Sequence, residues 1–127
     1  MHTDINKLAP IYESLHGMAI HIWLDDERDP TDPIIQKNFS STGDEVWVKT
    51  ADECIELLKS GRVSSISLDH DLGSEEAGTG YDVAVWIEEA AYNKGIPKLQ
   101  MRVHSANPVG RKNMERALIN AERFFNK

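Results

Sequence analysis

The sequence predicts a small α/β domain with about four parallel strands, in a doubly wound, three-layer arrangement. Short apolar segments alternate along the chain with amphipathic segments, as expected for strands that alternate with helices. Turn and capping residues mark the ends of most segments. The length of 127 residues fits one domain, since single domains cluster at roughly 100–150 residues. We therefore expect one domain over 1–127, in which residues 1–17 form an N-terminal extension.

The first half of the chain contains two predicted strands separated by a long irregular segment. A short helix over 4–16 would have to accommodate Pro10, a residue that disfavours helix interiors. Residues 18–24 are nearly all apolar, which is typical of a strand covered on both faces. The stretch 29–44 contains two prolines, Gly43 and a Ser-Ser-Thr cluster, so we expect a loop with one helical turn at most. Residues 45–49 alternate in polarity and predict the second strand.

The second half of the chain alternates regularly between helices and strands. Thr50 begins a capping box, and Asn107 provides a helix cap that is followed by proline at the first helical position. Strands that alternate with helices favour parallel pairing through right-handed crossovers. We expect helices over 50–60, over 79–93 and from 107 onwards, and strands over 64–68 and 99–104.

The composition argues against several classes of function. The chain has 21 acidic and 14 basic residues and a net charge of -7, whereas duplex nucleic acids are bound largely through Lys and Arg. No apolar run approaches the ~20 residues of a membrane span, so we expect no membrane partner. The single cysteine, Cys54, excludes an internal disulfide and fits the reducing cytoplasm, where we expect the protein to act. A small phosphorylated ligand remains compatible with this charge.

Polar side chains gather where three of the predicted strands end. In open parallel sheets, ligands bind outside the carboxyl ends of the strands, near the point where the strand order reverses. We therefore expect the functional site at this edge. The side chains placed there are Asp25 and Asp26 after the first strand, Asp69, His70 and Asp71 after the third, and His104, Ser105 and Asn107 after the fourth.

The carboxylates predict a divalent cation. Like charges from two neighbouring strands repel one another, and a bound cation relieves that repulsion. Hard oxygen ligands favour Mg²⁺ or Mn²⁺, with Asp25, Asp26 and Asp69 as ligands and Asp71 in support. A purely structural alternative is that Asp25 and Asp26 cap a turn and pair with Arg28.

Two histidines and the start of the last helix add catalytic and anion-binding groups. His70 and His104 could exchange protons near neutral pH, although a single histidine is more often structural. The free amides at the start of the last helix predict an anion site, and residues 73–78 could close over it as a lid. The candidate phosphate-binding side chains are Ser105, Asn107, Arg111, Arg28 and Thr79.

These residues resemble the receiver domain of two-component response regulators. The family carries an acidic pair after its first strand, an aspartate after its third and a Ser or Thr after its fourth. The resemblance implies that Asp25 and Asp26 bind Mg²⁺, that Asp69 is the acceptor-like residue and that Ser105 is the responding hydroxyl. This chain is truncated relative to a full receiver, because no fifth strand ending in lysine follows the last predicted helix.

A closer resemblance is to the cyclic-phosphate-processing receiver domains, a receiver-like family of bacteria and phages. It rests on four segments that together span most of the chain: 22–30, 67–73, 79–82 and 103–110. The family's name implies a role on cyclic phosphates of nucleotides or RNA ends.

The leading hypothesis is a metal-assisted phosphoesterase that hydrolyses such a cyclic phosphate. His70, His104 and Asp69 are its candidate catalytic residues, and a small phosphorylated ligand, a nucleotide or an RNA end is its expected partner. One alternative is a receiver-like module that binds a nucleotide or another protein without turnover. A third is a signalling receiver that is phosphorylated on Asp69.

Overall fold

The sheet carries the site and sets its position. The computed structural model describes residues 19–127, so the helix expected over 4–16 and the extension over 1–17 lie outside the described residues. Within this range, four strands form one parallel sheet in the order β2-β1-β3-β4. The order reverses between β1 and β3, which is where ligands bind in such sheets. The strands are β1 (Ile20–Leu24), β2 (Val46–Val48), β3 (Val63–Leu68) and β4 (Gln100–Val103).

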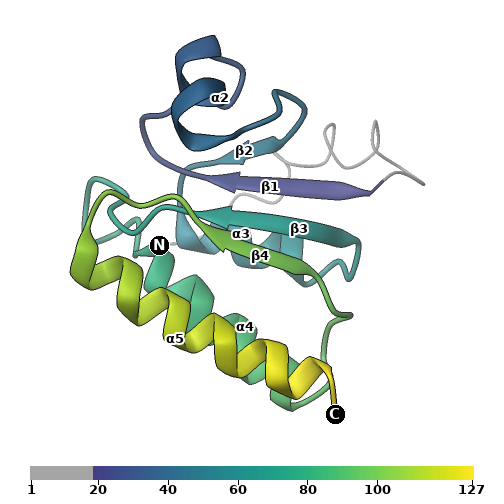
Figure 1. The fold of residues 1–127 in the computed structure, drawn as a ribbon. Coiled ribbons are helices and arrows are strands. Elements are labelled where there is room, and N and C mark those ends of the chain that lie inside the picture. The colour runs from purple at the N-terminus through teal and green to yellow at the C-terminus, as the bar shows by residue number, and fades with distance from the viewer. Residues whose placement is uncertain (1–18) are drawn as a thin grey trace.

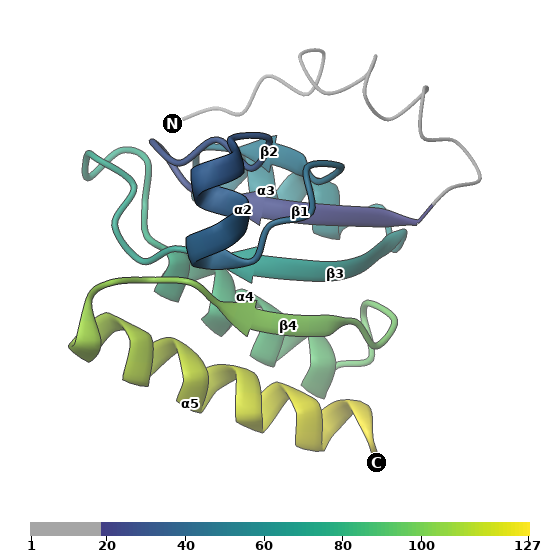
Figure 2. The same cartoon turned by 45° about the horizontal axis from the view of Figure 1, so that its top comes forward.

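Helices cover both sides of the sheet, but unequally. Figures 1 and 2 show α3 (Ala51–Leu58), α4 (Gly80–Tyr92) and α5 (Pro108–Phe125) on one side and α2 (Pro33–Phe39) on the other. The predicted α/β fold with about four parallel strands is therefore confirmed, and α2 is the only helix within residues 19–127 on its side. No helix in that range is long and apolar enough to cross a membrane.

The short helix α2 contradicts the loop predicted over 29–44. It makes about two turns, and none of its described residues is buried. It therefore lacks the buried face of helically spaced apolar residues from which a helix is predicted. Asp32 accepts a hydrogen bond from the amide of Ile34 at 2.9 Å, and Pro33 occupies the first turn. This is the same cap-and-proline signal that predicts α5 at Asn107.

The two faces of the sheet differ in polarity. Ile22, Leu24 and their neighbours pack against α3, α4 and α5 in the main core. Because side chains alternate along a strand, the opposite face carries polar groups, and a hollow of about 350 Å³ lies over it. The polar residues of the strands on this face are His21, Ser65, Ser67, Gln100 and Arg102.

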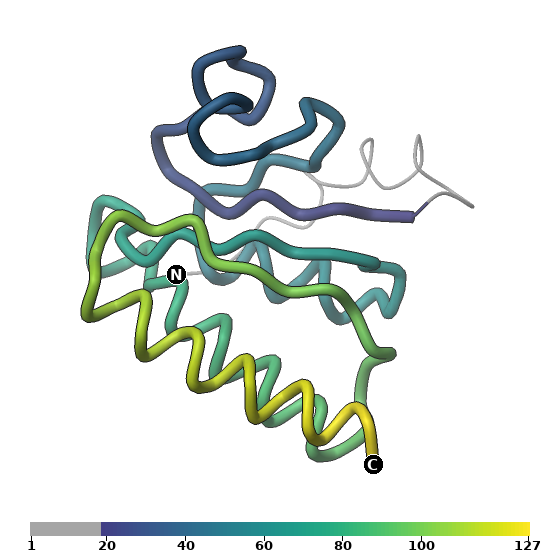
Figure 3. Tube along the Cα trace, in the orientation of Figure 1, coloured from purple at the N-terminus to yellow at the C-terminus, as the bar shows by residue number. Residues whose placement is uncertain are grey.

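All four strands point their carboxyl ends to one edge, and the loops after β1, β3 and β4 leave the sheet there (Figures 1 and 3). Every strand differs from its predicted range by one or two residues at one end or both: β1 begins at Ile20 rather than at residue 18, β2 covers only Val46–Val48, and β4 begins at Gln100. β3 begins at Val63 rather than Ser64, and β4 ends at Val103, so His104 lies just past the strand. Backbone hydrogen bonds between neighbouring strands continue to the residue that directly follows β1, β3 and β4. These bonds fix the positions of the first residues of the site.

Candidate functional site

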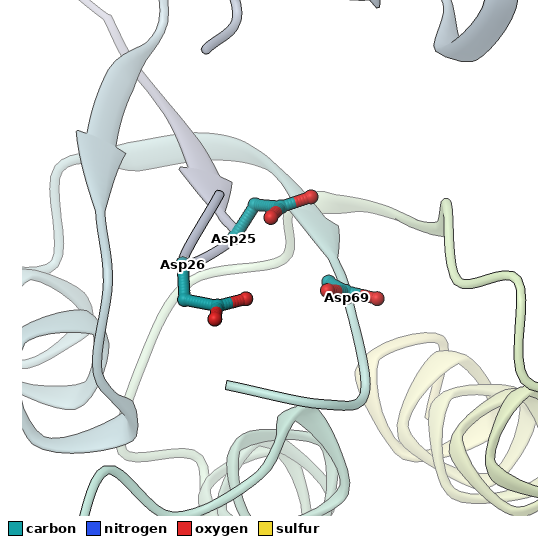
Figure 4. Close-up of side chains that lie close together, drawn as sticks. All are labelled: Asp25, Asp26 and Asp69. Carbon is teal, nitrogen blue, oxygen red and sulfur yellow. The ribbon is translucent and has the colours of Figure 1, made fainter. Parts of the chain in front are cut away.

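Three carboxylates converge at the edge where the strand order reverses (Figure 4). Asp25, Asp26 and Asp69 each bring one oxygen within 4.8 Å of the others. Asp25 is 0% exposed and Asp69 5% exposed, whereas Asp26 is half-buried. The predicted grouping of these three aspartates is thus present in the structure, and Asp71 lies outside it.

Backbone hydrogen bonds place these residues side by side. The amide of Asp25 donates to Val48, that of Asp69 to Leu24, and that of His104 to Leu68. Each residue that follows a strand is thereby fixed to the last residue of the neighbouring strand. The convergence of Asp25, Asp69 and His104 is a direct result of the parallel pairing.

Two indoles hold the loop that follows β1. Trp23 Nε1 donates to the carbonyl of Arg28 at 2.9 Å, and Trp47 Nε1 donates to the carbonyl of Asp25 at 2.7 Å. The loop backbone is therefore held at Asp25 and at Arg28 by contacts that do not involve the Arg28 guanidinium.

The Asp25 carboxylate accepts four hydrogen bonds. Its Oδ1 receives the amides of Glu27 and Arg28, both at 2.9 Å. Its Oδ2 receives His104 Nε2 at 3.0 Å and Arg28 Nη1 at 3.2 Å. Burial raises the pKa of Asp25, but these donors outweigh it and hold the pKa below its ordinary value. Asp25 is therefore ionised at neutral pH.

The pKa of Asp69 is shifted in the opposite direction to that of Asp25. Burial, followed by repulsion from Asp25, raises the pKa of Asp69 to about 6, although the His70 amide and Arg28 oppose the shift. Negative charge is thus incompletely compensated in this cluster. Three carboxylate oxygens are also the hard ligands that Mg²⁺ and Mn²⁺ prefer, so the residues fit a divalent cation.

His104 lies inside the protein rather than on an open surface. Its ring stacks on Trp23 with a centroid separation of 3.8 Å and meets the edge of Phe39. Burial lowers the pKa of His104, although Asp25 partly opposes this, so the ring is neutral. Because the ionised Asp25 can only accept, Nε2 carries the proton, and Nδ1 accepts from Ser67 Oγ at 2.7 Å. Both ring nitrogens therefore have buried protein partners, and the ring orients the Asp25 carboxylate.

His70 is the more accessible histidine. Its side chain is 22% exposed, and its Nδ1 lies 2.9 Å from Oδ1 of Asp71, whose side chain is 71% exposed. A Cβ on Gly110 would lie 2.4 Å from Cγ of His70. Glycine at this position therefore allows α5 to begin against the imidazole ring.

The start of α5 is capped by Asn107, as the sequence predicts. The amides of Val109 and Gly110 donate to Oδ1 of Asn107, so the helix satisfies them itself. Ser105 Oγ is buried and accepts from the Asn107 amide at 3.1 Å. Arg111 lies against Glu115 at 2.8 Å and donates to the carbonyl of Val103 at 3.2 Å. Each of these groups therefore has at least one protein partner, while the hydroxyl of Ser105 can still donate a hydrogen bond.

The loop after β3 borders the carboxylates. Thr79 caps α4 by accepting from the Asp82 amide at 3.2 Å. A hollow of about 470 Å³ follows residues 71–75 and 78–79 and reaches Asp82. Gly73 adopts a φ of 92°, and a Cβ there would lie 2.9 Å from Oδ2 of Asp26. The loop predicted as a lid therefore forms one wall beside Asp26.

Sequence reasoning missed the residues that support the site from behind. Ser67, Trp23 and Phe39 contact the His104 ring, and Phe39 also lies 4.5 Å from the guanidinium carbon of Arg28. Ser67 precedes Asp69 by two residues, so strand alternation could have placed both side chains on one face. Phe39 lies in α2, where the helix itself was not predicted.

A parallel sheet of this order, with an acidic cluster at its switch point, defines a receiver-like domain. Residues 20–120 match the family described as the cyclic-phosphate processing receiver domain, and the chain belongs to that family. The family predicted from the sequence motifs is thereby confirmed. Comparisons with curated proteins and with solved structures give no match.

Proposed function

We propose that this domain is a metal-dependent phosphoesterase that hydrolyses a cyclic phosphate on a nucleotide or an RNA end. The observation that carries the proposal is the cluster of Asp25, Asp26 and Asp69, with His70 next in the chain and its backbone amide donating to Asp69. The family description, cyclic-phosphate processing, supports the choice of substrate class.

The carboxylates supply the cation site in this proposal. Asp25, Asp26 and Asp69 would together hold Mg²⁺ or Mn²⁺, and Asp25 and Asp69 are the two that also contact Arg28. A divalent cation held by these carboxylates would supply Lewis-acid stabilisation of the phosphoryl oxygens and would lower the pKa of the attacking water. Asp71 orients His70 from outside the cluster, as a carboxylate commonly does for a catalytic imidazole.

His70 is the proposed proton-transfer group. Hydrolysis forms one bond from a water oxygen to phosphorus and breaks one ring P–O bond, and the departing sugar oxygen takes up a proton. His70 Nε2 would accept the proton that the attacking water loses and would return a proton to the departing sugar oxygen. Asp71 would hold Nδ1 of the ring meanwhile. Arg28, Ser105 and Thr79 would contact the phosphoryl oxygens, and His104 would position Asp25.

Phosphorus NMR tests the proposal directly. A panel of 2′,3′- and 3′,5′-cyclic nucleotides and a cyclic-phosphate-ended RNA is incubated with the protein and Mg²⁺ or Mn²⁺, with EDTA as control. We expect a cyclic resonance to convert to a monoester only when metal is present.

Variants separate this activity from contaminants and from simple binding. Asp26→Asn and His70→Ala should each reduce conversion at least about 100-fold, while Glu89→Gln, which removes an exposed carboxylate on α4, should leave it unchanged. Resonances that shift without conversion would favour the binding module. A stable mass increase on Asp69 after treatment with acetyl phosphate would favour the signalling receiver.

A further inference from the structure

The Arg28 guanidinium lies between two of the three clustered carboxylates. Its Nη1 is 3.2 Å from Oδ2 of Asp25 and 3.5 Å from Oδ2 of Asp69. One positively charged nitrogen thus contacts two of the three carboxylates that form the candidate cation site. The side chain already compensates part of the negative charge, because Arg28 opposes the rise in the pKa of Asp69.

The side chain can leave this position without disturbing the loop. The Arg28 side chain is 28% exposed, and its guanidinium lies over the Phe39 ring at 4.5 Å rather than in a closed core. The backbone of Arg28 is held separately, by its amide on Asp25 and by its carbonyl on Trp23. Asp25 would keep three of its four donors after the guanidinium departs.

We propose that Arg28 is an exchangeable internal cation. It compensates Asp25 and Asp69 while no metal is bound, gives up Asp69 when a divalent cation enters, and then contacts the phosphoryl group of the ligand. The inference rests on the metal site of the proposed function, but it does not require hydrolysis.

The proposal predicts that loss of Arg28 changes the affinities for metal and for phosphate in opposite directions. Without Arg28, a metal no longer competes with an internal positive charge for Asp25 and Asp69, so it binds more tightly. Phosphate bound beside the metal loses a bidentate donor, so it binds more weakly. An arginine that only supported the fold would weaken both.

The test measures both affinities on Arg28→Gln. Mn²⁺ binding is followed by the loss of the free-ion electron paramagnetic resonance signal, and inorganic phosphate binding to the Mn²⁺-loaded protein by calorimetry. We expect Mn²⁺ to bind about tenfold more tightly and phosphate at least about tenfold more weakly, each corresponding to about 1.4 kcal/mol. Lys59→Gln is the matched control, because Lys59 pairs with Glu56 on the surface of α3, and both affinities should stay unchanged.

Equal or weaker Mn²⁺ binding by folded Arg28→Gln would overturn the proposal. Should that variant not fold, nitrogen-15 NMR of the wild-type arginine side chains decides the question. The Arg28 Nε–H resonance, assigned with Arg28→Lys, should shift on addition of Mg²⁺, and a resonance that does not move overturns the exchange. Failure of the enzyme hypothesis has a different signature: the opposite changes in affinity persist, but no cyclic phosphate is hydrolysed.

Discussion

Replacing Asp69 with asparagine should make the folded protein more stable at alkaline pH when metal is absent. Asp69 has a pKa of about 6 in the folded chain against an ordinary value of 3.8, because of burial and then of repulsion from Asp25. A raised carboxyl pKa means that the protonated form is favoured by folding. The associated stability is present below pH 3.8 and is lost as the pH rises through about 6.

The size of the effect follows from the two pKa values. Each pKa unit corresponds to about 1.4 kcal/mol, so ionised Asp69 lowers the free energy of unfolding by about 3 kcal/mol at pH 8. Asp69→Asn removes this charge and keeps an oxygen that can accept from the His70 amide. The variant should therefore be about 3 kcal/mol more stable than the wild type at pH 8, with the difference shrinking toward zero near pH 4.

Urea unfolding in EDTA between pH 4 and pH 8 measures this difference. Comparing two proteins cancels the titration of the groups they share, and Glu89→Gln should show no such pH-dependent gain. Addition of Mg²⁺ at pH 8 should then stabilise the wild type more than Asp69→Asn. An Asp69→Asn protein that is equally or less stable than the wild type at pH 8 would refute the charge-repulsion argument.

Three further predictions concern the surroundings of the cluster. His104→Leu leaves the carboxylate of Asp25 and the hydroxyl of Ser67 without their buried partner, so urea unfolding should show a loss of about 2–5 kcal/mol. Gly110→Ala should displace the ring of His70 and lower the rate of cyclic-phosphate hydrolysis by about 100-fold, as measured by phosphorus NMR; an unchanged rate would remove the ring position from the mechanism. Burial raises the pKa of the Cys54 thiol, so Ellman's reagent should label it only after unfolding, and rapid labelling of the native protein would contradict its placement in the core.

Apart from α2, the order of strands and helices was predictable because its signals are local. Apolar runs, capping residues such as Thr50 and Asn107, and the polar residues that follow each strand all lie within a few positions of one another. Parallel pairing then brings the residues after neighbouring strands to one edge. These local rules were sufficient to predict the cluster of Asp25, Asp26 and Asp69.

The roles of individual side chains at that edge were less predictable. His70 and His104 both follow strands, yet one is accessible and the other is covered by Trp23 and Phe39. This difference depends on the placement of α2, which has no buried residues to give it an apolar pattern. The position of Arg28 between Asp25 and Asp69 likewise depends on β1 and β3 being neighbours in the sheet, which no local pattern encodes.

Two tryptophans contact the loop after β1, so their fluorescence is sensitive to changes at the site. Trp23 and Trp47 donate to the carbonyls of Arg28 and Asp25, at the two ends of the segment that carries the acidic pair. The emission of an indole depends on the charges and dipoles around it, so a cation or an anion that enters the site alters the light emitted from within the fold. Occupancy of the cluster can therefore be followed by intrinsic fluorescence, in unlabelled wild-type protein and at micromolar concentration.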